Sequence, residues 1–182
     1  MTRGKSFREA MKRGMVAAPG AYDCITARSI ERAGFDAVYM TGGGTAASLG
    51  YPDYGMLTMT EMADNAGRIA TAVKLPVIAD ADTGYGNELN AIRTVCEYEK
   101  RGVAGLHIED QGFPKKCGHL EDKVIAPVDD YIAKIRAAVS AKVDPDFLVI
   151  ARTDSRAVLG LDRKSTRLNS SHITPSRMPS SA

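Results

Sequence analysis

Short apolar runs alternate along this chain with longer segments in which apolar residues recur at helical spacing. A short run that is apolar on both faces is typical of a buried parallel strand, because helices cover both faces of such a sheet. The runs predict strands at Met15–Ala18, Asp36–Met40, Val77–Asp82, Gly105–Asp110 and Phe147–Asp154.

The segments between the runs have the period of one helix face. Thr60 is placed to cap a helix, and Gly34 is placed as the C-terminal cap of another. The inward residues predicted for that first helix are Met62, Ala66, Ile69 and Val73. Further helices are predicted over Phe7–Lys12, over Tyr22–Ala33 (Ile25 and Ile30 inward), from Asn87 to near Gly102 (Leu89, Ile92 and Cys96 inward), and around Val128, Ile132, Ile135 and Val139.

Strands that alternate with helices indicate parallel βα units. The three later strands share a further feature, since each is apolar at its start and charged at its end. The charged ends are Asp80 and Asp82, Glu109 and Asp110, and Arg152 and Asp154. In a (β/α)8 barrel such residues line the top face, where the βα loops build active sites. We therefore predict an α/β chain of the barrel type, and an open doubly wound sheet is the alternative.

Length and composition indicate one globular domain, since the chain has 182 residues of which 44% are hydrophobic. No apolar run approaches the ~20 residues of a membrane span. The first residues, Met1–Met15, are charged and unlike a secretory signal. Three cysteines without metal-type spacing are expected of a protein in the reducing cytoplasm.

The formal charge of +2 comes from the last 21 residues, because residues 1–161 carry 20 basic and 21 acidic side chains. The body of the protein therefore gives no electrostatic reason to expect a nucleic-acid partner. Asp162–His172 looks like a translated DNA-sequencing adaptor, and Ile173–Ala182 is rich in Ser and Pro. We predict a catalytic domain over 1–161 and a non-native, disordered tail over 162–182, the alternative being a natural disordered tail.

Asp80 and Asp82 stand two residues apart and would project from the same side of a strand. Two buried carboxylates side by side repel each other, and a bound cation relieves that repulsion. Oxygen ligands alone favour Mg2+ or Mn2+. The alternative is a pair of solvated loop aspartates.

Cys117 lies in a basic loop, between Lys115 and Lys116 on one side and His119 on the other. Neighbouring positive charge lowers the pKa of a thiol, which makes Cys117 a candidate general acid/base or nucleophile. The alternative is a small residue without a chemical role. Cys24 and Cys96 lie on predicted helices, and both are assigned to the hydrophobic core.

Arg152, at the end of a predicted strand, can bind a substrate carboxylate through two N–H groups or pair with a nearby aspartate. His107 shares its strand with Glu109 and is interpreted as an interior histidine. Gly42, Gly44 and Ala47 match a dinucleotide-binding fingerprint, but Leu49–Asp53 interrupts the helix that should follow it. A backbone N–H cradle for a carboxylate or phosphate fits that segment better.

Taken together, these motifs resemble the isocitrate lyase/phosphoenolpyruvate mutase superfamily, and within it the methylisocitrate lyase-like members, from about Gly14 to Leu161. The motifs are Tyr39-Met-Thr-Gly-Gly-Gly44, Leu49-Gly-Tyr-Pro-Asp53, Asp80-Ala-Asp-Thr-Gly-Tyr-Gly86, His107-Ile-Glu-Asp-Gln111, Lys115-Lys-Cys-Gly-His119 and Ala151-Arg-Thr-Asp154. The resemblance implies a (β/α)8 barrel of which this chain would hold about the first five βα units. It also implies a C-terminally truncated chain whose full-length form is a homotetramer.

The resemblance further implies the roles of individual residues. Mg2+ would be held at Asp53, Asp80, Asp82 and Glu109, directly by Asp80 and largely through water by the others. The residues implied to bind substrate are Tyr39, Thr41, Gly42, Gly43, Asp82, Gly118 and Arg152. Many members have Ser where Thr41 stands, which keeps the hydroxyl. Cys117, with Lys115, Lys116 and His119, would form the catalytic loop.

The activity that the resemblance implies is Mg2+-dependent cleavage of a carbon–carbon bond in a 2-hydroxy or 2-oxo di- or tricarboxylate such as 2-methylisocitrate. Cys117 would exchange a proton with the product carbon. Members that act on phosphonates generally lack this cysteine motif, which favours the lyase. The alternatives are an oxaloacetate decarboxylase, a phosphoenolpyruvate- or phosphonopyruvate-type mutase or hydrolase, and an inactive fragment, since a closed barrel needs ~8 strands.

Overall fold

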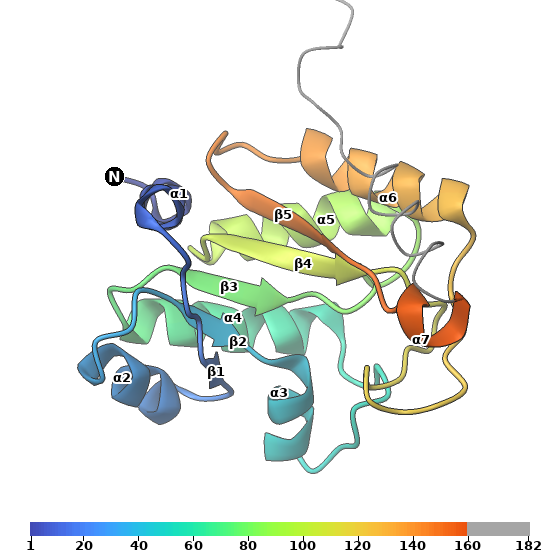
Figure 1. The fold of residues 1–182 in the computed structure, drawn as a ribbon, viewed down its shortest axis with the longest axis horizontal. Coiled ribbons are helices and arrows are strands. Elements are labelled where there is room, and N and C mark those ends of the chain that lie inside the picture. Colours follow the sequence, from blue (N-terminus) through green and yellow to red (C-terminus); the bar gives the residue numbers. More distant parts are fainter. Residues whose placement is uncertain (160–182) are drawn as a thin grey trace, which may run out of the picture.

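The computed structural model describes residues 1–159, which form one sheet of five parallel strands (Figure 1). The strands lie side by side in chain order, so each βα unit adds one strand to the same edge. The strands are β1 (Gly20–Ala21), β2 (Val38–Met40), β3 (Val77–Asp80), β4 (Gly105–Glu109) and β5 (Leu148–Arg152). No helix within residues 1–159 is long and apolar enough to cross a membrane.

Seven helices are described, and four of the five longest begin at a residue whose side chain accepts a hydrogen bond from the first turn, the exception being the helix after Pro127. The helices are α1 (Arg3–Arg13), α2 (Cys24–Arg32), α3 (Gly42–Ser48), α4 (Met59–Ala72), α5 (Glu88–Lys100), α6 (Val128–Ser140) and α7 (Ser155–Leu159). Asn87 caps α5 as predicted, and its side chain accepts from the backbone N–H groups of Leu89 and Asn90.

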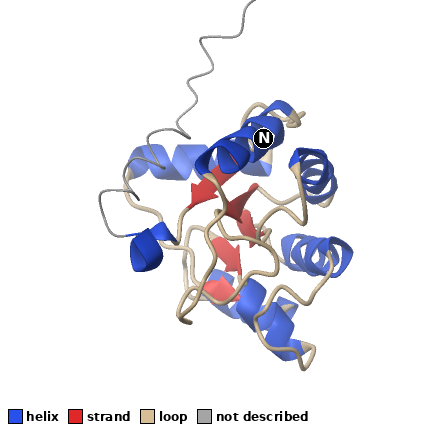
Figure 2. Ribbon diagram, turned by 90° about the vertical axis from the view of Figure 1, so that its right-hand side faces the viewer, coloured by secondary structure: helices blue, strands red, loops and turns tan. Residues whose placement is uncertain are grey.

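Four helices cover one face of the sheet in the order α2, α4, α5, α6, each packed against its neighbour (Figures 1 and 2). The main hydrophobic core lies between them and the sheet. Helix α1 instead lies across the amino ends of the strands, where Phe7 packs against Ile78 and Leu148. The carboxyl ends of the strands are left free for loops.

Alternate residues of the central strands point away from these helices. Tyr39 pairs in register with Ile78, Asp80 with His107, and Glu109 with Arg152. On this inner face, apolar residues stand near the start of each strand and polar ones at its end. The prediction that charged side chains gather at the carboxyl ends of the strands is therefore confirmed.

Several sequence-based details are wrong. Met15–Ala18 is not a strand, because the chain pairs with β2 only from Pro19 onward, and the Met15 side chain is 98% exposed. The cap of α4 is Thr58 and not Thr60, since Thr58 forms a reciprocal capping box with Glu61. The apolar period also overestimated burial, and the predicted inward residues found at the surface are Ile25, Leu89 and Ile92.

The predicted tail, residues 162–182, lies outside the described residues. The helix over Tyr22–Ala33 is confirmed to within two residues at each end, and Gly34 follows it with a φ of 83°. At that φ a side chain would be strained, which is why glycine suits the position.

Candidate active site at the carboxyl ends of the strands

A cavity of about 390 Å³ opens at the carboxyl end of the sheet. Its walls come from β2, β3, β5 and the long β4–α6 loop, and they bring together most of the residues that the sequence singled out. The lining residues are Tyr39, Thr41, Gly43, Asp53, Asp80, Lys115, Cys117, Gly118, His119, Arg152 and Asp154.

Asp80, at the end of β3, is buried and held by backbone and side-chain donors. The backbone N–H groups of Gly42 and Asp82 donate to its two oxygens at 3.1 and 3.0 Å, and the Tyr39 hydroxyl lies 3.1 Å from Oδ2. Burial alone would raise the pKa of Asp80. His107, Lys115 and the Asp82 N–H outweigh that effect and hold the pKa below its ordinary value.

His107 connects to this carboxylate through Tyr39. Its Nε2 lies 2.7 Å from the Tyr39 hydroxyl and 3.5 Å from Asp80 Oδ1, and the two rings stack. Burial lowers the pKa of His107, although the nearby Asp80 carboxylate opposes that effect. With the proton on Nε2, His107 donates to Tyr39 and Tyr39 donates to Asp80, which gives both hydrogens an acceptor. His107 thus orients the tyrosine hydroxyl.

Asp82 does not project from the strand beside Asp80 as predicted. Strand β3 ends at Asp80, and Asp82 has a φ of 45°, so the backbone turns before the second carboxylate. That turn aims Asp82 at the β4–α6 loop, where Lys115 Nζ lies 2.8 Å from Oδ1. Burial and the nearby Asp80 charge raise the pKa of Asp82 to about 6, although Lys115 opposes the rise.

Lys115 also binds Asp53, with Nζ 2.5 Å from Oδ1. Burial would lower the pKa of Lys115, but Asp82, Asp53 and Asp80 together raise it above its usual range, so the side chain is an ammonium. The sequence placed both loop lysines beside the thiol. The structure instead places the Lys115 ammonium between two carboxylates, because they are the stronger partners for a buried cation.

Glu109, at the end of β4, is 1% exposed. Arg152 Nη1 lies 3.5 Å from its Oε2, and Oε1 has no hydrogen-bond partner within residues 1–159. Burial raises the pKa of Glu109 to about 8, although Arg152 and Lys115 oppose it. Arg152 shares its guanidinium with Asp154 at 3.3 Å, so the predicted ion pair forms, and the Arg152 side chain also lines the cavity.

The loop over residues 111–127 carries Cys117, Gly118 and His119 into the cavity wall. The Cys117 backbone N–H donates to Asp53 O at 3.0 Å, which ties this loop to the segment after α3. A Cβ on Gly118 would lie 2.6 Å from Arg152 Nη2, so glycine allows the close approach. Lys116 is not part of the wall, and its backbone instead exchanges two hydrogen bonds with the Gln111 side chain.

The glycine segment after β2 forms the first turn of α3. A Cβ on Gly42 would lie 2.6 Å from Asp80 Oδ2, and one on Gly43 would lie 3.0 Å from Asp53 Oδ2. Of the N–H groups predicted to hold a carboxylate or phosphate, that of Gly42 donates to the chain's own Asp80 and that of Gly44 donates to Thr41 Oγ1. Helix α3 ends at Ser48, so the long helix of a dinucleotide fold is not formed here.

The carboxylate oxygens are suitable ligands for a divalent cation, but their present arrangement is less suitable. Burial raises the pKa values of Asp82 and Glu109, and Glu109 Oε1 has no hydrogen-bond partner within residues 1–159, so the ionised forms of both groups lack full stabilisation. The donor set is oxygen only, which fits Mg2+. Within residues 1–159, however, no three acidic, histidine or cysteine side chains converge as metal ligands, and Lys115 stands between Asp53 and Asp82.

Sequence reasoning missed three residues of this network. His107 was interpreted as interior packing, Asp154 was noted only as a charged strand end, and Gln111 was not assigned a role. Gln111 Nε2 donates to Asp154 at 2.8 Å and so joins the loop to β5. The alternation of His107 with Glu109 on one strand was the available signal for His107. Nothing local marked Gln111, since its partners are 5 and 43 residues away.

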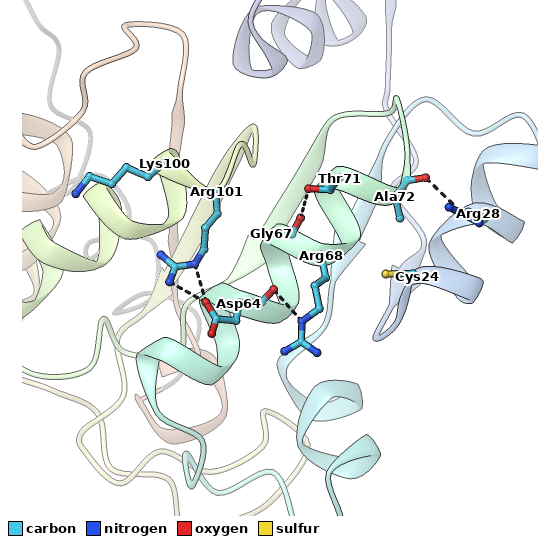
Figure 3. A pocket seen from close by; sticks show the side chains of 9 residues that line it. All are labelled: Cys24, Arg28, Asp64, Gly67, Arg68, Thr71, Ala72, Lys100 and Arg101. Carbon is cyan, nitrogen blue, oxygen red and sulfur yellow. Dashed lines mark hydrogen bonds and ion pairs between the residues drawn. The ribbon is translucent and has the colours of Figure 1, made fainter.

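A larger cavity of about 800 Å³ lies outside the sheet, between α2, α4 and the end of α5 (Figure 3). It contains none of the predicted site residues. Arg101 forms ion pairs there with Asp64 at 2.7 Å and with Glu97 at 2.6 Å. Cys24 also lines this cavity. The chemistry predicted from the sequence therefore belongs to the smaller cavity.

Comparison with known proteins decides the family. A family model described as phosphoenolpyruvate phosphomutase matches residues 7–169. The chain belongs to the phosphoenolpyruvate mutase/isocitrate lyase superfamily. It is 54% identical over 164 residues to 2,3-dimethylmalate lyase of Eubacterium barkeri, a match that covers 89% of this chain and 57% of that protein. The chain also matches a crystal structure of 2,3-dimethylmalate lyase with a TM-score of 0.90 and 45% identity. The match covers 94% of this chain and 59% of the chain in that structure.

Two other superfamily members are informative. The chain is 46% identical over 162 residues to 2-methylisocitrate lyase of Escherichia coli, covering 87% of this chain and 55% of that one. It is also similar to phosphonopyruvate hydrolase, crystallised with oxalate and Mg2+, at 32% identity and a TM-score of 0.86, covering 94% and 59%. The barrel-type fold predicted from the sequence is confirmed, and the chain spans little more than half the length of these superfamily relatives.

Proposed function

We propose that the whole protein is a Mg2+-dependent carbon–carbon lyase acting on a 2-hydroxy or 2-oxo di- or tricarboxylate. The observation that carries this proposal is one cavity in which a buried acidic cluster and Arg152 face the loop of Cys117. Superfamily relatives named as lyases on such acids are 43–54% identical to the chain, and a carboxyvinyl-carboxyphosphonate phosphorylmutase of Arabidopsis thaliana is 45% identical. The Cys117 loop motif, and not overall identity, favours the lyase over the mutase and hydrolase alternatives.

Asp80, Asp82, Asp53 and Glu109 would hold the cation, which in a structure of a relative accompanies oxalate. When bound, Mg2+ would stabilise negative charge that develops on a substrate oxygen. The chain's own residues supply the remaining steps. Arg152, which lines the cavity, would bind a substrate carboxylate, and the Thr41 hydroxyl would donate to the substrate beside Tyr39, whose own hydrogen is held by Asp80.

Cys117 is the proposed general acid. Cleavage of the carbon–carbon bond leaves an electron pair on the carbon next to a carboxylate, and the Cys117 thiol donates its proton to that carbon. In the reverse direction the thiolate removes the same proton. The loop that carries Cys117 can exclude water from this step, because Cys117, Gly118 and His119 form part of the cavity wall.

The test is a panel of 2-hydroxy and 2-oxo diacids assayed with the whole protein and Mg2+. We expect Cys117→Ser to lower kcat by about 10²- to 10⁴-fold while Mg2+ binding in calorimetry is unchanged. Cys24→Ser, in the outer cavity, is the matched control and should keep full activity. Turnover by Cys117→Ser equal to wild type would remove the thiol from the mechanism.

The resemblance also supports a homotetramer in the cytoplasm as part of this proposal. Analytical ultracentrifugation of the whole protein measures its oligomeric state directly. The assay with the panel of diacids, run on the 182-residue chain, decides whether these residues alone are active. An inactive fragment is the alternative to an active lyase.

A further inference from the structure

The turn that follows β3 has a strained backbone. Within residues 1–159, three residues other than glycine have a positive φ, and two of them, Asp82 at 45° and Tyr85 at 60°, lie in this turn. The turn is closed by the Gly84 N–H, which donates to Ala81 O at 2.8 Å. Side chains are strained at such φ values, so this backbone persists only where surrounding contacts hold it in place.

Tyr98, on α5, supplies such contacts at both ends of the turn. Its side chain is fully buried, and its hydroxyl donates to Asp80 O at 2.9 Å. The same hydroxyl lies 3.0 Å from the hydroxyl of Tyr85. A hydroxyl has one hydrogen, and that of Tyr98 is given to Asp80, so Tyr85 donates to Tyr98. One hydroxyl therefore joins the residue before the turn to a residue at its far end.

A second helix holds the middle of the turn. Lys134, on α6, donates from Nζ to Thr83 O at 2.8 Å. Neither Tyr98 nor Lys134 lines the cavity, and both belong to the helices that cover the sheet. Their contacts fix the backbone that aims Asp82 at Lys115.

We propose that Tyr98 is a positioning residue for the two aspartates of this turn. Its hydroxyl fixes the backbone of Asp80 and the course of the turn, and so sets where the Asp82 carboxylate lies, without contacting substrate or cation. The Asp82 N–H also donates to Asp80 Oδ1 at 3.0 Å, so a shift of the turn moves both carboxylates together. The inference rests on the proposed function only where the lyase reaction is used as a readout.

The first experiment measures amide hydrogen exchange of the turn, on the whole protein in EDTA. Each rate is taken relative to that of a core amide in β4, which removes the effect of global stability. Tyr98→Phe keeps the ring and removes the hydroxyl, so the Gly84 amide should exchange about tenfold or more faster than in wild type. Tyr131→Phe is the matched control, because it also removes one buried tyrosine hydroxyl, which donates to Ile108 O and Arg152 O. Its Gly84 amide should exchange within about twofold of wild type.

A double-mutant cycle tests whether the two tyrosines act as one chain of hydrogen bonds. Tyr85→Phe removes the hydrogen bond to Tyr98 and should accelerate the same exchange. Since Tyr98→Phe already removes that bond, adding Tyr85→Phe to it should change the rate by less than about twofold. Effects that multiply in the double variant would overturn the chain.

The second experiment measures kinetics. In the lyase reaction at saturating Mg2+, Tyr98→Phe should lower kcat about tenfold with KM within about twofold of wild type. The reason is that displaced carboxylates act on the transition state, while Arg152 and Thr41 still bind the substrate. Phe7→Ala, at the amino end of the sheet, should keep kcat although it also destabilises the fold. A merely structural tyrosine would leave kcat unchanged in the same way.

The outcomes separate this inference from the proposed function. If wild type cleaves no acid of the panel, the lyase proposal fails, and the exchange experiment in EDTA still decides the role of Tyr98. If wild type is active and Tyr98→Phe matches it in either measurement, the positioning role is overturned and the lyase proposal stands. Equal acceleration of the turn in Tyr98→Phe and Tyr131→Phe would also overturn that role. Should Tyr98→Phe fail to fold, Tyr85→Phe carries the exchange test, and an unchanged rate in it overturns the inference.

Discussion

At the scale of single residues, burial determines the chemistry of the site more than charge type does. Asp82 and Glu109 are both acidic residues at strand ends, and burial raises their pKa values to about 6 and about 8. Asp80 is as deeply buried, yet its pKa stays below the ordinary value because His107, Lys115 and a backbone N–H stabilise its charge. The pKa values of these three neighbouring carboxyl groups therefore differ, with that of Asp80 the lowest and that of Glu109 the highest.

Glu109 leads to a pH prediction for the protein without divalent cations. Its pKa is about 8 in the folded state and 4.5 as the reference value, so the folded state binds the proton more tightly. Stability is then lost as the pH rises from about 4.5 to 8, by up to about 1.4 kcal/mol per pH unit. Urea unfolding in EDTA should show this fall in wild type and a flatter profile in Glu109→Gln.

The control for that experiment is Glu121→Gln, an exposed carboxylate on the β4–α6 loop. Its profile should follow wild type. Parallel pH profiles for wild type and Glu109→Gln would contradict the raised pKa.

At the scale of elements, the first turn of a helix determines the residue at which the helix begins. Helix α4 illustrates this, because two threonines compete for its cap. The Thr58 side chain accepts from Glu61 N–H while the Glu61 carboxylate accepts from Thr58 N–H at 2.7 Å. Thr60 lies inside the helix by the same assignment, so the register of α4 begins two residues earlier than the apolar period indicates.

Thr58→Ala should therefore destabilise the protein by about 1 kcal/mol, because it leaves first-turn N–H groups without their side-chain acceptor. Thr60→Ala, an exposed position, is the matched control and should change the free energy of unfolding by less than about 0.5 kcal/mol. Chemical denaturation of both variants tests this directly. Equal losses would show that the capping box does not control the start of α4.

At the scale of the whole molecule, the sheet separates stability from chemistry along its strands. Helix α1 closes the amino end, where Phe7 joins the cluster of Ile78 and Leu148 and Arg8 donates to Asp146 O at 2.9 Å. The carboxyl end holds the cavity and its charged residues. Loops at that end can move without exposing the main core, which lies between the sheet and α2, α4, α5 and α6.

Phe7→Ala tests whether stability and chemistry are separated between the two ends of the sheet. It should lower the free energy of unfolding by about 3 kcal/mol, since it empties a packed position at the amino end, and should leave Mg2+ affinity unchanged. Met11→Ala, on the exposed side of the same helix, should cost far less. A loss of Mg2+ affinity in folded Phe7→Ala would show that the two ends of the sheet are coupled.

The sequence by itself determined the order of the elements and the end of the sheet that carries chemistry. Apolar period and strand-end charges are local properties of the chain, so four of the five strands and the shared edge of Asp80, Glu109 and Arg152 could be predicted. Exposed apolar residues such as Ile25 were mispredicted because the period gives the face of a helix but not the width of the surface it covers.

Only the tertiary structure decided which charges meet. Lys115 pairs with Asp53, 62 residues away, and not with the thiol two positions along, because a buried ammonium must find carboxylates. The turn that aims Asp82 at Lys115 and the link from His107 through Tyr39 to Asp80 likewise join separate strands and loops. Contacts of this kind depend on distances in space, which spacing along the chain does not encode.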